Sequence, residues 1–201
     1  MNMTKKKIYP FLIIAIALFL FLATRAAQNV NAEELPNTSN AVIEFEAGAL
    51  SIPSAPGFSF KKGAIAAQSQ AYTLEDEMLT PLAIYDLTGS NAGWEVTVAL
   101  STFKDTNNAP TLTGAVLTLN PNTVSPLNNT IATAPELAEA ETFALTAGGD
   151  AINLLVAESE NGGGAWALDF TNAGTTLTVF PGTATAAESS AILTWSIVTG
   201  P

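Results

Sequence analysis

The sequence predicts an all-β domain, a β-sandwich or barrel of about nine to ten short strands with at most one short helix. Short segments in which apolar and polar residues alternate recur along the chain, and clusters of Gly, Asn and Pro separate them. Only one segment, residues 135–141, is a good helix candidate. The length of 201 residues suits one domain with a sizeable core.

Residues 1–32 are predicted to be a signal peptide. Three lysines precede an apolar run at residues 11–23, and Val30-Asn31-Ala32 fits the small-x-small rule for cleavage after Ala32. The run is shorter than the roughly 20 residues that span a membrane, so we expect secretion and no membrane insertion of the mature chain. An uncleaved anchor is the alternative.

The first part of the mature chain contains one clear alternating segment. Residues 33–41 are predicted to be a flexible N-terminus, and the domain itself to span residues 42–201. In residues 42–47, apolar Ile43 and Phe45 alternate with glutamates, which predicts a half-buried strand. Residues 64–71 are compatible with a short helix.

Residues 81–100 predict a hairpin. A strand at residues 82–87 and a strand that begins at Trp94 flank a turn-rich loop. In the second strand Trp94, Val96 and Val98 share one face, because side chains alternate along a strand.

Further alternating segments follow the hairpin. Residues 120–134 are predicted to be a surface connection, and residues 135–141, PELAEAE, to be the one helix. The remaining strands are predicted around residues 115–119, 143–145, 152–156, 166–170, 177–179 and 193–197.

The charge of the mature chain argues against two classes of partner. Four of the seven basic residues lie in the signal segment, which leaves three lysines against 18 acidic residues, a net charge of −15. Such a surface repels the phosphates of nucleic acids and of anionic lipids. We therefore expect no nucleic-acid partner.

The chain has neither cysteine nor histidine. Ser-His-Asp and Cys-His catalysis and ordinary zinc sites are therefore excluded. A carboxylate pair within Glu75, Asp76 and Glu77 is the remaining hydrolytic candidate, but a solvated acidic loop is the better interpretation. We expect no enzyme activity and no cofactor.

Two Asx-rich turns could supply oxygen ligands for calcium, although neither matches the twelve-residue calcium loop. They are Asp105 with Asn107 and Asn108, and Asp86 with Ser90 and Asn91. Such turns also form for backbone reasons alone. No metal site is assigned, and calcium stays open.

The three tryptophans could be core residues or a stacking platform for sugar rings. Trp94, Trp166 and Trp195 each share a strand face with aliphatic neighbours, which favours the core. The candidates for contact with a ligand are then the polar residues of the hairpin. These are Asp86, Ser90, Asn91 and Glu95.

The hairpin and the last strand together resemble the WxL domain family. The resemblance rests on LAIYD followed by GWEVTV at residues 93–98, and on TWSIV at residues 194–198. It covers most of residues 42–201. The third motif position is Val96 in one copy and Ile197 in the other, where the family name gives leucine; both are apolar residues that suit a buried strand.

The resemblance implies a non-catalytic surface protein of low-GC Gram-positive bacteria. It also implies non-covalent attachment to the cell wall, with peptidoglycan as the ligand, in a complex with a membrane-anchored partner protein and other surface proteins. The alternative is a protein–protein module that docks on the membrane-anchored partner without touching glycan. The motif residues Trp94, Val96, Trp195 and Ile197 are expected to be structural.

Overall fold

The computed structural model describes residues 39–75, 79–138 and 142–201. All of the regular structure in these ranges is β, which confirms the predicted all-β class. The described residues contain 14 strands, more than the nine or ten that were predicted. The predicted signal peptide lies outside the described residues. Within those ranges no helix is long and apolar enough to cross a membrane.

Phe45–Pro201 forms one compact unit of antiparallel sheets. The first sheet has the order β1 (Leu50–Ser54), β3 (Leu82–Asp86), β11 (Gly164–Phe170), β7 (Pro121–Pro126). The second has the order β14 (Leu193–Thr199), β4 (Trp94–Leu100), β10 (Ile152–Ala157), β8 (Glu136–Leu137). Residues of both sheets meet in a single hydrophobic core.

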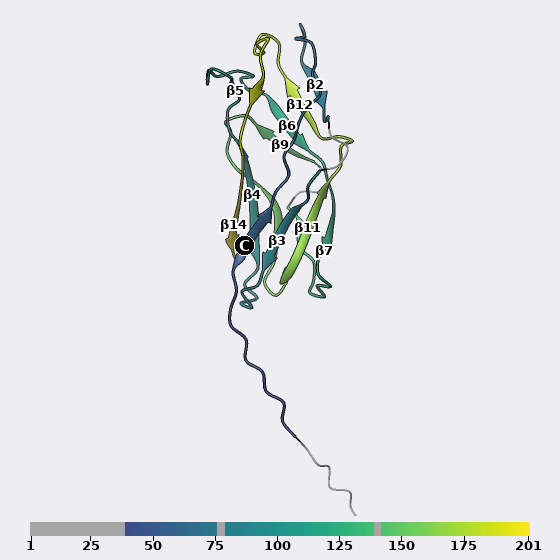
Figure 1. The fold of residues 1–201 in the computed structure, drawn as a ribbon, viewed down its shortest axis with the longest axis vertical. Helices are drawn as coiled ribbons and strands as arrows, with labels where there is room; N and C mark the ends of the chain where they lie inside the picture. Colours follow the sequence, from purple (N-terminus) through teal and green to yellow (C-terminus); the bar gives the residue numbers. More distant parts are fainter. Residues whose placement is uncertain (1–38, 76–78, 139–141) are drawn as a thin grey trace, which may run out of the picture. The chain divides into compact units, whose positions relative to one another are not determined.

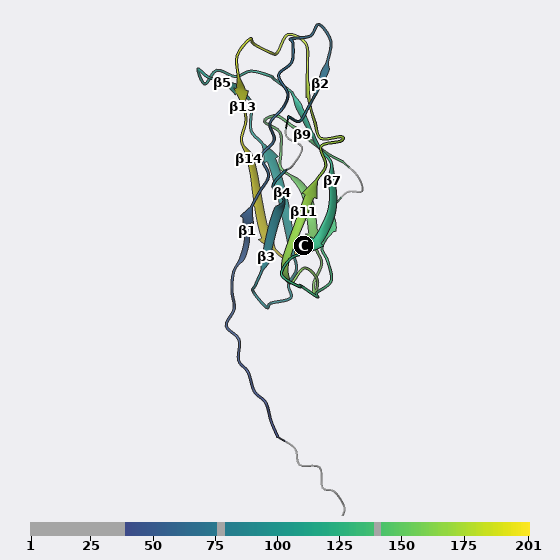
Figure 2. The ribbon, with the colours of Figure 1, turned by 45° about the vertical axis from the view of Figure 1, so that its right-hand side comes forward.

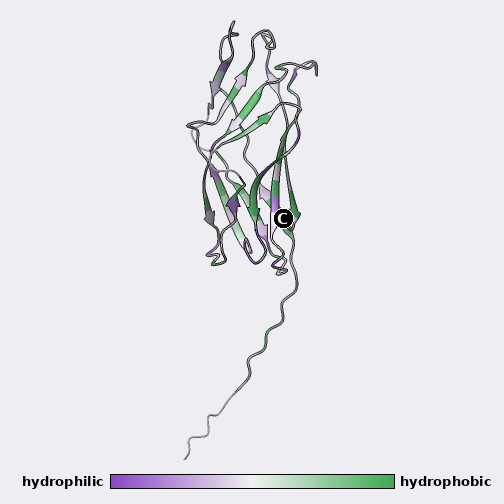
Figure 3. Ribbon diagram, turned by 180° about the vertical axis from the view of Figure 1, so that it is seen from behind, coloured by the Kyte–Doolittle hydropathy of each residue, from purple (hydrophilic) through white to green (hydrophobic). Residues whose placement is uncertain are grey.

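A third sheet lies at the end of the unit drawn uppermost in Figures 1 and 2. Its order is β2 (Gln70–Thr73), β12 (Thr176–Val179), β6 (Val116–Leu119), β9 (Phe143–Thr146). A two-stranded ribbon joins β5 (Lys104–Asp105) to β13 (Ser189–Ser190). Figure 3 shows hydrophobic and hydrophilic residues interspersed along the strands, as expected for strands with one face in the core.

The alternation predicted for the second strand of the hairpin is present in β4, whereas β11 departs from alternation. In β4 the residues from Trp94 to Leu100 are alternately buried and half-buried, as expected for a strand with one face in the core. In β11 nearly every residue is buried, because β3 and β7 flank it in the sheet and its alanines are covered as well as Trp166 and Leu168.

Strand β10 departs from the predicted pattern. The strand predicted at residues 152–156 is present, and regular alternation would place Ile152, Leu154 and Val156 on one face. A β-bulge between Asn153 and Leu155 instead shifts the register against β4. Leu154 and Leu155 are both fully buried, and Val156 is only half-buried. A bulge inserts one residue and exchanges the faces beyond it, which strict alternation cannot anticipate.

The strand predicted at residues 42–47 is absent. Ile43 is 74% exposed and Phe45 is 82% exposed. Pairing begins only at Gly48, whose N–H donates to Leu87 O at 2.8 Å. Alternation alone does not make a strand where no neighbouring strand supplies hydrogen bonds.

The predicted helix at residues 135–141 is also wrong where the structure describes it. Glu136–Leu137 is β8, which pairs with Leu155 and Val156 of β10, and residues 139–141 lie outside the described part. Its Ala, Glu and Leu residues favour a helix, but so short a helix is marginal by itself, and pairing with a neighbouring strand outweighs that preference.

Two loop regions also differ from expectation. Residues 64–71 form no helix: residues 64–69 have no regular structure, and β2 begins at Gln70. The connection predicted at residues 120–134 contains β7, an edge strand that begins and ends on prolines. Prolines are tolerated on edge strands because one side of the strand needs no N–H donors.

Trp94 is enclosed completely, with 0% of its surface exposed. Its Nε1–H donates to Gly162 O at 3.1 Å, across 68 positions of sequence. Gly162 has φ +72°, and a Cβ there would lie 2.7 Å from Trp94 Nε1. The indole therefore requires glycine at this position, both for the backbone angle and for space.

Replacing Trp94 by alanine should lower the free energy of unfolding by about 3–5 kcal/mol, because a fully buried aromatic ring leaves a cavity. Trp195→Ala is the matched control, since Trp195 is only half-buried on edge strand β14, and it should cost less. Urea denaturation measures both. A Trp94→Ala protein as stable as the parent would contradict this packing.

Candidate functional site

The loop between β3 and β4 is built on the side chain of Asp86. Its Oδ1 accepts hydrogen bonds from the Thr88 N–H at 3.0 Å and from the Thr88 hydroxyl at 2.6 Å. The Thr88 hydroxyl also lies 2.9 Å from Ser90 Oγ. This is an Asx turn extended by two hydroxyls, and it fixes the carboxylate within its own loop.

Positive φ angles turn the backbone of the β3–β4 loop. Asn91 has φ 55°, which asparagine tolerates better than most residues, and Gly93 has φ 75°. A Cβ on Gly93 would overlap the Ala157 carbonyl at the end of β10. Gly93 thus allows the β3–β4 loop to approach the loop that follows β10.

That second loop, between β10 and β11, is bonded directly to the first. The Glu160 N–H donates to Asn91 O at 2.9 Å, and Ser159 Oγ donates to the same oxygen at 3.2 Å. The loop then reaches Gly162, which lies against the Trp94 ring. Both loops are therefore anchored at the point where β4 begins.

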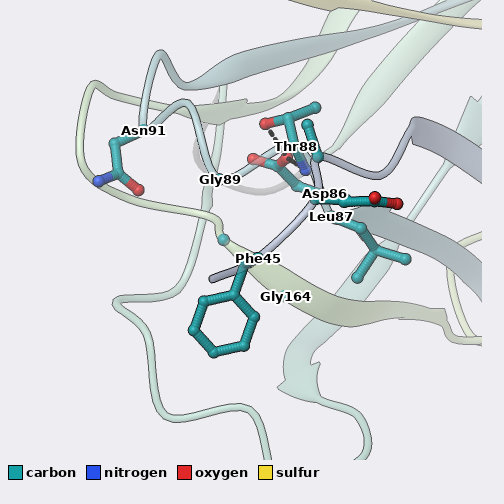
Figure 4. A pocket seen from close by; sticks show the side chains of 10 residues that line it. Phe45, Asp86, Leu87, Thr88, Gly89, Asn91 and Gly164 are labelled. Carbon is teal, nitrogen blue, oxygen red and sulfur yellow. Dashed lines mark hydrogen bonds between the residues drawn. The ribbon is translucent and has the colours of Figure 1, made fainter. Parts of the chain in front are cut away.

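A pocket of about 460 Å³ lies beside these loops. Figure 4 shows it from close by, with the side chains of Phe45, Asp86 and Thr88 among those around it. Its lining consists of Phe45, Glu46, Ala47, Asp86, Leu87, Thr88, Gly89, Asn91, Gly163 and Gly164. We call it the loop-end pocket.

Asp86 presents one oxygen to this pocket. The residue is only 7% exposed, and Oδ2 has no hydrogen-bond partner among the described residues. No buried polar side-chain atom in that part of the chain lacks a partner, so Oδ2 reaches solvent. The pocket therefore holds a carboxylate that is fixed through Oδ1 and open at Oδ2.

Two of the four polar residues singled out from the sequence line the loop-end pocket. Asp86 and Asn91 are in its wall; Ser90 is exposed on the loop without lining it. Glu95 is half-buried on the outer face of β4, paired with Val156 and Val198. The structure brings Asp86 and Asn91 together and leaves the other two outside.

Phe45 and the glycines at 163 and 164 also line the pocket, although the sequence did not single them out for contact with a ligand. Phe45 was assigned to the face of a strand that does not form. The run of three glycines at residues 162–164 was a usable signal, since such a run permits close backbone approach, but its neighbour in space was unknown.

The two tryptophan motifs lie on neighbouring strands. Trp195 pairs with Val98, and Ile197 pairs with Val96, in the antiparallel pair of β14 and β4. Val96 is fully buried, whereas Trp195 and Ile197 are half-buried, as expected on an edge strand. The Trp195 ring meets the Phe170 ring edge-on, with centroids 6.1 Å apart. The motifs thus pack on the same core face.

The geometry gives little support to the carboxylate pair at residues 75–77 or to a calcium site at Asp105. Glu75 is exposed, and its two acidic neighbours lie outside the described residues. Asp105 Oδ1 accepts from the Asn107 and Ala109 N–H groups at 2.8 and 2.9 Å, as in an ordinary Asx turn. Over residues 39–75, 79–138 and 142–201, no three acidic side chains gather as a metal site would need.

A comparison with known protein families decides the identity. A family model described as "WxL domain surface cell wall-binding" matches residues 29–201. The chain belongs to the WxL domain family. No curated protein and no solved structure matches it significantly.

Membership places the chain among surface proteins that bind the cell wall, which is consistent with a non-catalytic role. The match extends over both tryptophan motifs, at Trp94 and Trp195. In this WxL domain the two motifs form one structural unit, because their strands are adjacent and share a face.

Asp86→Ala should destabilise the protein by about 1–3 kcal/mol, because it removes the acceptor of two hydrogen bonds, one of them from a backbone N–H. Asp86→Asn keeps an acceptor oxygen at that position and should lose much less stability. Thermal unfolding of the two variants makes the comparison. Equal losses in both would show that the turn does not depend on the Oδ1 contacts.

Proposed function

We propose that this protein, exported and cleaved after Ala32, attaches non-covalently to peptidoglycan as a subunit of a surface complex. The complex would include a membrane-anchored partner protein. The observation that carries the wall contact is the loop-end pocket, where Asp86 is fixed by Thr88 and keeps Oδ2 open. Membership of a family described as cell wall-binding also supports a contact with the wall.

The chemistry of the loop-end pocket suits uncharged sugar rings. A carboxylate oxygen and the Asn91 amide can accept and donate hydrogen bonds to sugar hydroxyl and amide groups. The ring of Phe45, 82% exposed at the rim, offers an apolar face on which a sugar ring can pack. Asp86 and Glu46 both repel anions, so the neutral glycan is favoured over a charged polymer.

The charge of the whole chain supports a short-range contact. A net charge of −15 beyond residue 32 repels the anionic polymers of a Gram-positive wall. Long-range steering therefore opposes the encounter, and the attraction has to come from hydrogen bonds and stacking. Salt should accordingly strengthen the binding modestly, because it screens the repulsion.

A second candidate function is docking on a partner protein without glycan contact. The segment just before the first sheet favours it, since Val42 is 93% exposed and Ile43 is 74% exposed, in an alternating pattern with glutamates. Such a segment can add as a strand to the open edge of a partner's sheet.

Sedimentation with purified peptidoglycan, in the absence of other proteins, separates the two functions. The intact protein should co-sediment, and Phe45→Ala and Asp86→Asn should each weaken binding by about tenfold, the equivalent of one lost contact of about 1.4 kcal/mol. Matched controls are Phe180→Ala, another exposed phenylalanine, and Asp105→Asn, another Asx-turn carboxylate. No sedimentation of the parent protein would favour the docking module.

Binding to peptidoglycan should also increase as the pH is lowered from 7 toward the sequence pI of about 4.2, because the net negative charge falls. The same sedimentation assay at several pH values measures this. Binding that stays equal or weakens at the lower pH would remove charge repulsion from the account.

A further inference from the structure

A second cleft lies at the other end of the compact unit. Its volume is about 800 Å³, within the range of sites for small ligands. It lies at β2 and β12, which Figure 1 places at the end away from the Asp86 end of β3. The loop at residues 184–189 forms another wall, so we call it the β2–β12 cleft.

One wall of this cleft is held in place by Tyr72. The Tyr72 hydroxyl donates to Ala64 O at 2.8 Å, and the Lys61 N–H donates to Thr73 O at 2.9 Å. A Cβ on Gly63 would overlap the Tyr72 ring, so the backbone at residue 63 lies flat on that ring. The segment that carries Lys61 and Lys62 is thus fixed against β2.

The cleft gathers most of the positive charge of the mature chain. Lys61 and Lys62 both line it, and they are two of the three basic residues beyond residue 32. Neither ammonium group makes an ion pair with a described residue. Glu75 and Glu188 also line the cleft, so its charge is mixed and not simply cationic.

The rest of the lining includes apolar and small residues. Leu112, Leu177 and Val179 are buried core residues that reach the cleft, and the opposite loop contributes alanines. Leu112 has φ 49°, which a leucine rarely adopts, and its N–H is held by Thr183 O at 2.9 Å. Such strain persists only where the surroundings enforce it, and it is frequent at binding sites.

We propose that the β2–β12 cleft binds a short peptide with small side chains and a free terminal carboxylate. The carboxylate lies on the Lys61 and Lys62 ammonium groups, and the small side chains lie on the floor made by Leu177 and Val179. An amino group of the same peptide is accommodated by Glu75 or Glu188. Phosphate polymers fit less well, because these carboxylates line the same cleft.

This inference rests on the proposed function in one respect. Peptidoglycan contains peptides as well as glycan, and the two clefts then divide its chemistry: neutral sugar at the loop-end pocket and peptide at the β2–β12 cleft. Contacts at both ends would allow one molecule to hold two sites on the wall, which raises the overall affinity without a strong individual site.

The test is an NMR titration of the ¹⁵N-labelled protein with the tripeptide Lys-D-Ala-D-Ala. Amide shifts should cluster at residues 61–63, at Tyr72 and at residues 184–189. The double variant Lys61→Gln/Lys62→Gln should weaken binding about tenfold or more, and amidation of the peptide's carboxyl end should do the same. Lys104→Gln, the remaining lysine, is the matched control and should bind like the parent.

Equal binding of the amidated peptide, an unchanged double variant, or shifts confined to the loop-end pocket would each overturn the proposal. All three exchanged lysines are exposed, so folding should be retained in every variant. Sedimentation with peptidoglycan separates this inference from the proposed function. If the parent protein sediments with peptidoglycan but does not bind the tripeptide, the proposal for the β2–β12 cleft alone is refuted. If it binds the tripeptide but does not sediment, attachment to peptidoglycan alone is refuted.

Discussion

The contact between Trp94 and Gly162 holds together the end of this domain that carries the β3–β4 and β10–β11 loops. The indole is fully buried, and its only N–H is satisfied by a carbonyl from a loop 68 positions away. A buried donor without a partner would lower the free energy of unfolding by about 1–3 kcal/mol. Burial of the Trp94 ring therefore depends on the position of the Gly162 loop. The side chain at the start of β4 thereby fixes the position of the loop before β11.

The loop-end pocket depends on this contact. Asp86 ends β3, Trp94 begins β4, and Gly162 precedes the two glycines that line the pocket. The hydrogen bonds from Glu160 and Ser159 to Asn91 complete the link between the loops. Trp94 can therefore affect the loop-end pocket from within the core, because it sets the distance between the two loops beside that pocket.

Much of the fold could be predicted from the sequence, because alternation in β4, β6 and β12 reports directly which face is buried. The failures are tertiary in origin. The bulge in β10 and the strand at Glu136–Leu137 depend on pairing partners that local patterns do not reveal. The same holds for the candidate site. The turn-rich sequence indicated Asp86, but only the folded chain brings Phe45 and the glycines at 163 and 164 beside it.

The most direct test of the account asks whether the motif tryptophans contact the wall ligand. The indole N–H signals of Trp94 and Trp195 can be followed by NMR while peptidoglycan fragments, made soluble by muramidase, are added to the ¹⁵N-labelled protein. The account predicts that both indole signals stay in place while the backbone amides of Gly89 and Asn91 shift. Indole signals that move first, with the loop amides unchanged, would contradict it.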